Sequence, residues 1–201
     1  MPTKRQVLGD FYYREAKRRG LRSRSALKLL ELARRFSIFK QGDCVVDLGA
    51  APGGWIQVAR EFVGPHGKII GVDISEMSPL PFANVHIIKG DICDPSTATR
   101  ILETAGRPVD VVLSDLAPKF SGIHDLDHAR QISLTRSAVS LAESLMRPGG
   151  KMVIKLIMGS EFNRFLKDIR EKFQFVVLYK PKASRDSSSE IYLICKGWKG
   201  F

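Results

Sequence analysis

The chain has 201 residues, which is enough for one domain built around a single hydrophobic core. No stretch approaches the roughly 18 consecutive apolar residues that a membrane-spanning helix requires. The basic start is not followed by an apolar segment, so a secretory signal is not expected. Three cysteines that lie far apart predict core thiols rather than disulfides or a metal site, and we expect a cytoplasmic protein.

The basic residues are concentrated near the N-terminus. The chain has a net charge of +11, and residues 1–40, with 12 Lys and Arg against 3 Asp and Glu, account for +9 of it. A solvated surface helix is the simplest explanation of such a segment. Concentration on one short segment nevertheless favours contact with a polyanion, and above all with a nucleic acid.

Two helices are expected within this segment. The first, over residues 10–20, is short and basic and ends at Gly20. Ser23 or Ser25 is expected to cap the second, which runs to about position 37 and has apolar residues at helical spacing. Lys28 lies in the middle of the second helix, where a lysine is ordinarily solvated.

A strand, a glycine-rich turn and a helix follow. The strand is apolar until it ends on Asp47, and Gly49, Gly53 and Gly54 then allow a tight turn and close approach to a ligand. The spacing matches neither G-x-G-x-x-G nor G-x-x-x-x-G-K-[ST]. Asp73 ends the next strand about 20 residues after Gly53, as expected of an acid that binds ribose hydroxyls. A cofactor with a ribose but no pyrophosphate, such as S-adenosylmethionine, fits this pattern, and an ordinary turn without a ligand is the alternative.

The rest of the chain alternates strands with helical patterns, which predicts a parallel sheet with helices on both faces. Two final strands, 175–179 and 191–195, are joined by a polar segment without a helix, which predicts a hairpin and one antiparallel strand. The predicted fold is α/β, with a seven-stranded, mostly parallel sheet and a C-terminal antiparallel hairpin strand, as in the Rossmann-like methyltransferases that use S-adenosylmethionine. The other expected elements are strands at 68–73, 85–89, 109–114 and 151–156 and helices at about 126–146 and 160–172.

Four acidic residues stand at or just beyond the ends of successive strands: Asp47, Asp73, Asp91 and Asp115. The carboxyl ends of parallel strands share one rim, where ligands bind. A single Asp there is usually a helix cap or a turn residue, but four in succession favour a ligand site. S-adenosylmethionine would offer cations and hydrogen-bond donors to this rim, whereas a triphosphate would be repelled.

A lysine, Lys155, interrupts the apolar strand 151–156 near its end. A buried charge is costly unless it is paired. The expected partners are Asp115, on the neighbouring strand end, and Glu190, where the last strand begins on the same rim. A purely structural ion pair is the alternative to a catalytic group.

Five motifs resemble those of the FtsJ-like RNA ribose 2′-O-methyltransferases, most closely the branch that acts on uridine in large-subunit ribosomal RNA. They are SALKL at 25–29, DLGAAPGGW at 47–55, LSDLAP at 113–118, VIK at 153–155 and SSEIY at 188–192. Lys119 and Phe120 depart from the family pattern, which concerns substrate fit more than chemistry. The resemblance implies a catalytic tetrad of Lys28, Asp115, Lys155 and Glu190. It also implies cofactor contacts by Gly53, Trp55, Asp73, Asp91 and Asp115. No metal is expected, because a strong methyl donor needs little acid help and the sequence offers no metal-ligand cluster.

The resemblance implies an enzyme that transfers a methyl group from S-adenosylmethionine to a ribose 2′-hydroxyl of RNA. Lys155 would orient the hydroxyl and take its proton or, if it stays charged, stabilise developing negative charge. Residues 1–40 would form a basic helical extension that contacts RNA, and residues 41–201 the methyltransferase domain of a monomer. The sequence does not distinguish between naked RNA and an assembled large ribosomal subunit as the substrate. Methylation of tRNA or of an RNA cap and a non-catalytic RNA- or ribosome-binding role are the alternatives, and the missing G-x-G-x-x-G motif disfavours a nicotinamide oxidoreductase.

Overall fold

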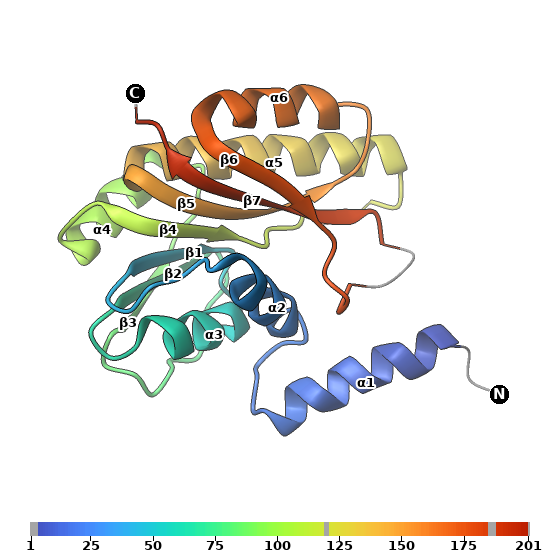
Figure 1. Cartoon of the computed structure of the whole chain (residues 1–201), viewed down its shortest axis with the longest axis horizontal. Coiled ribbons are helices and arrows are strands. Elements are labelled where there is room, and N and C mark those ends of the chain that lie inside the picture. The colour runs from blue at the N-terminus through green and yellow to red at the C-terminus, as the bar shows by residue number, and fades with distance from the viewer. Residues whose placement is uncertain (1–3, 119–120, 185–187, 201) are drawn as a thin grey trace.

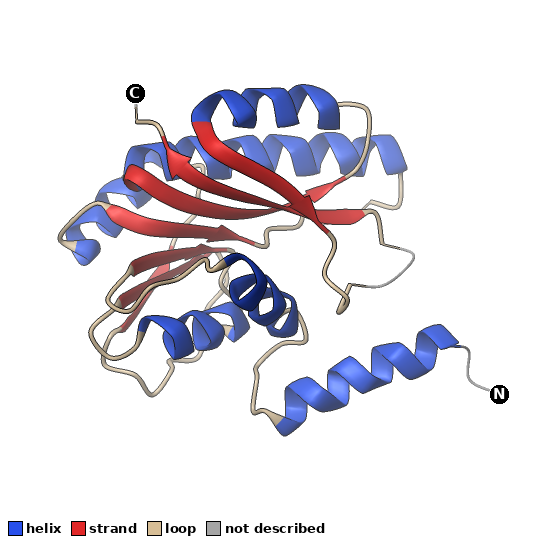
Figure 2. Cartoon of the chain, in the orientation of Figure 1, coloured by secondary structure: helices blue, strands red, loops and turns tan. Residues whose placement is uncertain are grey.

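The computed structural model describes residues 4–118, 121–184 and 188–200. A seven-stranded sheet lies between two layers of helices (Figure 1, Figure 2). The strands are β1 (Cys44–Leu48), β2 (Lys68–Asp73), β3 (Val85–Lys89), β4 (Val109–Ser114), β5 (Met146–Ile157), β6 (Phe173–Tyr179) and β7 (Glu190–Trp198). The helices are α1 (Lys4–Arg18), α2 (Ala26–Phe36), α3 (Gly54–Val63), α4 (Pro95–Ala105), α5 (His124–Leu145) and α6 (Phe162–Lys172).

The order of strands across the sheet is β3-β2-β1-β4-β5-β7-β6. Strand β7 runs antiparallel to both β5 and β6, and the other neighbouring strands are parallel to one another. This confirms the predicted mostly parallel, seven-stranded sheet with a reversed strand in the C-terminal hairpin.

Both faces of the sheet are covered because the central strands are apolar on both sides. In β1, Cys44 and Val46 pack into a cluster with α4, α5 and α6, whereas Val45 packs into a second cluster with α1, α2 and α3. Figure 1 shows α5 and α6 over one face and α2 and α3 over the other. The sheet is therefore the middle layer of three, and its edge at the carboxyl ends of the parallel strands stays accessible.

The strand register places the candidate catalytic residues near one another. Asp115 is the first residue after β4, and Lys155 of β5 lies opposite Tyr192 of β7. Glu190 begins β7 opposite Ile157. Because β7 is reversed, its first residues lie at the same edge of the sheet as the ends of β4 and β5.

The N-terminal segment is divided between a projecting helix and a core helix. Helix α1 begins at Lys4, earlier than expected, and extends away from the body in Figure 1. Helix α2 is integral to the second cluster, with Leu29 and Leu32 fully buried, although it falls within the expected extension 1–40. Ser25 is its N-cap as predicted, but the Ser25 side chain makes no capping hydrogen bond.

Two further differences concern the other side of the sheet. Strand β5 begins at Met146 instead of about residue 151, because Met146 pairs with Val109 across a bulge and Arg147 binds Asp110 at 2.6 Å. Helix α4 was not among the elements predicted from the sequence. Among the described residues, no helix combines the length and the apolar character needed to cross a bilayer.

Candidate active site

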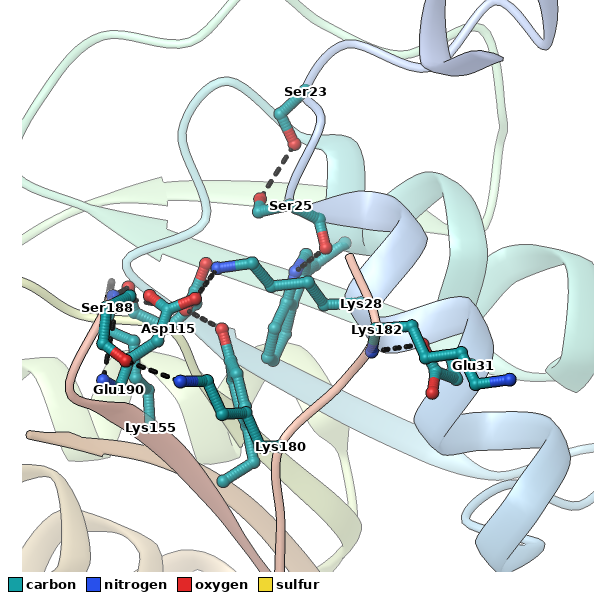
Figure 3. A network of polar contacts seen from close by, with 12 residues as sticks. Ser23, Ser25, Lys28, Glu31, Asp115, Lys155, Lys180, Lys182, Ser188 and Glu190 are labelled. Atoms are coloured by element: carbon teal, nitrogen blue, oxygen red, sulfur yellow. Dashed lines mark hydrogen bonds and ion pairs between the residues drawn. The ribbon is translucent and has the colours of Figure 1, made fainter. Parts of the chain in front are cut away.

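Two ion pairs meet at the carboxyl edge of the sheet (Figure 3). Lys155 Nζ lies 3.1 Å from Asp115 Oδ1 and donates a hydrogen bond to the Asp115 backbone oxygen at 2.8 Å. Lys28 Nζ donates to Glu190 Oε1. The predicted pairing of Lys155 with Asp115 is thus present, whereas the direct partner of Glu190 is Lys28. The structure brings all four residues of the expected tetrad together.

Tyr192 connects the two pairs. Its hydroxyl donates to Asp115 Oδ1 at 2.8 Å, and the Lys28 amine lies 5.7 Å from the centre of its ring. The side chain is fully buried. Burial, reinforced by the carboxylates of Asp115 and Glu190, raises the pKa of Tyr192 well above its ordinary value. The hydroxyl therefore remains a hydrogen-bond donor that holds the Asp115 carboxylate in place.

Lys28 reaches the site because α2 is docked onto the start of α3. The Trp55 indole nitrogen donates to the backbone oxygen of Ser25 at 3.0 Å, which fixes the first turn of α2. Lys28 is consequently buried and not solvated as a lone helical lysine would be. Burial raises the pKa of Glu190, but the hydrogen bond and charge of Lys28 outweigh it, so the net pKa lies below its ordinary value. Glu190 is therefore a carboxylate at neutral pH.

The glycine turn lies beside these pairs and requires glycine at two positions. Gly49 has φ +78°, and a Cβ there would lie 2.5 Å from Cδ2 of Leu116, the neighbour of Asp115. Gly53 has φ +104°, and a Cβ there would crowd Leu80 at 3.2 Å. Positive φ is strained for any residue with a Cβ. The turn thus keeps its backbone close to the strand ends without side chains in the way.

The expected cofactor residues occupy different positions around this turn. Asp73 lies at the end of β2, and its Oδ2 accepts a hydrogen bond from the Ala51 backbone nitrogen at 2.9 Å. Asp91 is exposed beyond β3, and its Oδ1 accepts from the Cys93 backbone nitrogen at 2.9 Å. Trp55 is only 3% exposed, so its side chain packs in the core. A contact between Trp55 and a ligand would have to come from its backbone.

Asp47 does not lie on the exposed rim as predicted. It is the fourth residue of β1, is 1% exposed, and neither carboxylate oxygen has a hydrogen-bond partner among the described residues. Burial, with added repulsion from Asp115 and Asp73, raises its pKa well above the ordinary value. An unpartnered acid between two other acids is unfavourable unless a cation or a donor approaches it.

This arrangement fits S-adenosylmethionine. Its ammonium, sulfonium and ribose hydroxyls are cations or donors. Asp73, at the end of β2, and Asp115, just after β4, provide acceptors, and the buried Asp47 lies on β1 between these two strands. The glycine turn provides room for a ligand to approach the backbone at Gly49 and Gly53. No group of three or more His, Cys, Asp or Glu able to hold a metal ion occurs among the described residues. Lys119 and Phe120 lie outside the described residues.

Sequence reasoning assigned no structural role to Arg22. Its guanidinium donates to the backbone oxygens of Pro52, Ser78 and Pro79 at 3.2, 2.6 and 2.7 Å. Arg22 thus joins the glycine turn to the segment that follows β2, although it was expected to contact RNA. Tyr192 is the last residue of the SSEIY motif, but a tyrosine in an apolar strand looks like an ordinary core residue, so its bond to Asp115 was not predicted. Arg22 lies in the basic N-terminal extension, so the sequence suggests an RNA contact instead of its structural role.

The chain is similar to known methyltransferases. The family model described as FtsJ-like methyltransferase matches residues 21–198. Ribosomal RNA large subunit methyltransferase E of Halorubrum lacusprofundi is 46% identical over 189 residues, which are 94% of this chain and 70% of that protein. The protein of the same name from Methanothrix thermoacetophila is 48% identical over 187 residues, 93% of this chain and 72% of that protein. The crystal structure of a ribosomal RNA methyltransferase from Plasmodium falciparum has a TM-score of 0.79 at 32% identity, covering 90% of this chain and 100% of that one. The chain therefore belongs to the FtsJ-like methyltransferase family.

Proposed function

We propose that this chain transfers the methyl group of S-adenosylmethionine to a ribose 2′-hydroxyl of RNA, at a uridine of large-subunit ribosomal RNA. The observation that carries the proposal is the buried Lys28–Glu190 and Lys155–Asp115 pairs beside the glycine turn. The ribosomal RNA large subunit methyltransferases to which the chain is similar support the choice of RNA.

The geometry of Lys155 suits proton removal from a hydroxyl. In its neutral form an amine has two N–H donors and one lone pair. The two acceptors next to Lys155 Nζ, the backbone oxygen and Oδ1 of Asp115, both come from one residue. When both N–H groups point at Asp115, the lone pair points elsewhere and can accept the proton of the 2′-hydroxyl.

The other residues of the site position this amine and the two reactants. Tyr192 and Lys155 both bind Asp115 Oδ1, so the carboxylate is held from two sides. Lys28, held by Glu190, places a positive charge near the attacking oxygen and stabilises its developing negative charge. Gly53, Asp73 and Asp91 would hold S-adenosylmethionine, which supplies an electrophilic methyl group. No metal is assigned a role.

One chain supplies all four residues of the tetrad, so a monomer is sufficient for the reaction. We restrict the proposed RNA-contacting extension to about residues 4–24, because α2 belongs to the core and Lys28 to the site. Residues 25–201 then form the methyltransferase domain. The free thiols and the RNA substrate agree with the cytoplasmic location expected from the sequence. Cys44 and Cys195 are buried as expected of core thiols, whereas Cys93 is exposed.

The test is transfer of labelled methyl from S-adenosylmethionine to total RNA, followed by mapping of the modified ribose. Lys155→Met should lower kcat by about 10²- to 10⁴-fold, as expected for loss of a general base, while S-adenosylhomocysteine affinity stays within about threefold. Lys196→Met is the matched control, because Lys196 lies on β7 toward the opposite edge of the sheet. Retained turnover in Lys155→Met would remove this lysine from the mechanism. A label on tRNA, on a cap or on no RNA would overturn the proposed substrate.

A further inference from the structure

We propose that a cleft beside the active site binds a nucleobase of single-stranded RNA next to the methylated nucleotide. This inference deepens the proposed function and depends on its RNA substrate. The cleft has a volume of about 620 Å³ and lies between α1, α2 and the segment that joins β6 to β7. Its lining includes Phe11, Tyr12, Arg34, Arg35, Tyr179 and Lys182.

The cleft and the active site share their walls. Helix α2 supplies Lys28 to the ion pairs, and it supplies Leu27, one residue earlier, and Glu31, three residues later, to the cleft. The Lys182 backbone nitrogen donates to Glu31 Oε2 at 2.9 Å, and the segment after Lys182 leads to Glu190 at the start of β7. Figure 3 shows Lys28, Glu31 and Lys182 in one view, with the Lys28 amine pointing toward Glu190. A strand of RNA with one ribose at Lys155 can therefore place a neighbouring nucleotide in the cleft.

The aromatic residues of the cleft are exposed in a way that suits base stacking. Phe11 is 54% exposed and packs edge-on against Tyr12, with ring centres 5.4 Å apart. Across the cleft the Arg35 guanidinium lies 5.0 Å from the centre of the Tyr179 ring. Aromatic rings combined with cationic side chains are the means by which proteins hold unpaired bases, because every base has a face that can stack.

The charge of the cleft favours an anionic partner such as RNA over a basic or apolar one. Its two acids are already engaged: Glu15 binds Arg19 at 2.6 Å, and Glu31 accepts the Tyr179 hydroxyl at 2.6 Å. Arg34 and Arg35 are exposed and form no ion pair with an acid among the residues that the structure describes. They remain able to bind phosphates on either side of a stacked base. Double-stranded RNA would not present the face of a base to Phe11.

Helix α1 also provides a matched control. Tyr13 is 60% exposed, close to the exposure of Phe11, but it is not part of the lining of the cleft. Residues two apart on a helix point to nearly opposite sides. Removing either ring exposes little new surface, so both variants should fold, and circular dichroism checks this.

The experiment measures the affinity of the full chain for a fluorescent decauridylate and for an abasic strand of the same length. Phe11→Ala should weaken binding of decauridylate by about 5- to 100-fold and leave binding of the abasic strand within about twofold. Tyr13→Ala should leave both affinities within about twofold. Arg34→Gln should weaken both strands alike and make binding less dependent on salt, because its contact is with phosphate.

Equal losses in Phe11→Ala and Tyr13→Ala, or a wild type that binds the two strands equally, would overturn the inference and leave the cleft to a protein partner. Methyl transfer is measured separately on the same preparations. If the chain methylates RNA but Phe11→Ala binds decauridylate normally, only the cleft is wrong. If binding depends on Phe11 but no RNA ribose is methylated, only the proposed function is wrong.

Discussion

Tyr192→Phe tests whether the Tyr192 hydroxyl holds the Asp115 carboxylate in place beside Lys155. The substitution keeps the ring, which packs 5.9 Å from Trp55 and 5.7 Å from the Lys28 amine, and removes only the donor to Asp115 Oδ1. The Asp115 carboxylate then retains Lys155 as its side-chain partner. We expect the variant to fold with a less stable and less ordered active site.

The size of the effect follows from burial and charge. A hydrogen bond to a charged acceptor contributes about 1.5–3 kcal/mol, and the substitution removes one such bond from the largely buried Asp115 carboxylate. For a chain of this size each kcal/mol lowers the melting temperature by about 2–4 °C, which gives a total decrease of about 3–12 °C. We also expect kcat to fall about 10-fold, equivalent to about 1.4 kcal/mol, because Asp115 positions Lys155 less firmly.

Thermal unfolding and single-turnover methyl transfer measure these two quantities. Tyr179→Phe is the control for unfolding, since it removes another tyrosine–carboxylate bond, from Tyr179 to Glu31 Oε1 at 2.6 Å, at a partly exposed position. Its cost should stay below about 1.5 kcal/mol. Wild-type melting temperature and turnover in Tyr192→Phe would refute the role of the Tyr192 hydroxyl in holding Asp115.

Two further substitutions probe the cofactor side of the site. The raised pKa of Asp47 means that the folded chain keeps a proton which the unfolded chain releases near its ordinary pKa of about 4, so stability should fall as pH rises above that value. In urea unfolding without cofactor, Asp47→Asn should therefore be more stable than the wild type by about 1 kcal/mol at about pH 8 and about equally stable at about pH 4. A difference in unfolding free energy that does not change with pH would contradict this. Gly49→Ala places a Cβ at φ +78° and 2.5 Å from Leu116, and should lower both stability, by about 1–3 kcal/mol, and S-adenosylhomocysteine affinity in calorimetric titration. Gly42 has φ +82° and nothing within 4 Å of a Cβ, so Gly42→Ala should lower stability but leave S-adenosylhomocysteine affinity unchanged. Equal affinities in the two variants would show that Gly49 has no specific role in cofactor binding.

Much of the sheet and its ligand edge could be predicted because the signals are local. Runs of apolar residues that end on an acid or a glycine fixed the expected bounds of β2, β3 and β4, which the structure reproduces. Helix α4 also has local signals, with Pro95 at its first turn, Asp94 as its N-cap and Gly106 after its end. Its apolar face is short, with only three buried residues, so hydrophobic periodicity alone did not reveal it.

The burial of individual charges was harder to predict because it depends on packing between distant segments. Asp47 and Asp115 look alike in sequence, each near a strand end. Asp47 is inside β1, where its side chain turns into the interior, whereas Asp115 is one residue beyond β4. Lys28 is buried only because α2 lies on α3, and neither helix alone indicates that contact.

The docking of α2 has a consequence for any shortened form of the protein. A chain trimmed to residues 41–201 would keep every strand and the glycine turn, yet it would leave Glu190 facing solvent without its amine. It would also lack Leu29 and Leu32, which pack on one face of the sheet, and would expose an apolar surface prone to aggregation. The shortest form that keeps the complete set of ion pairs therefore has to begin before β1 and include α2.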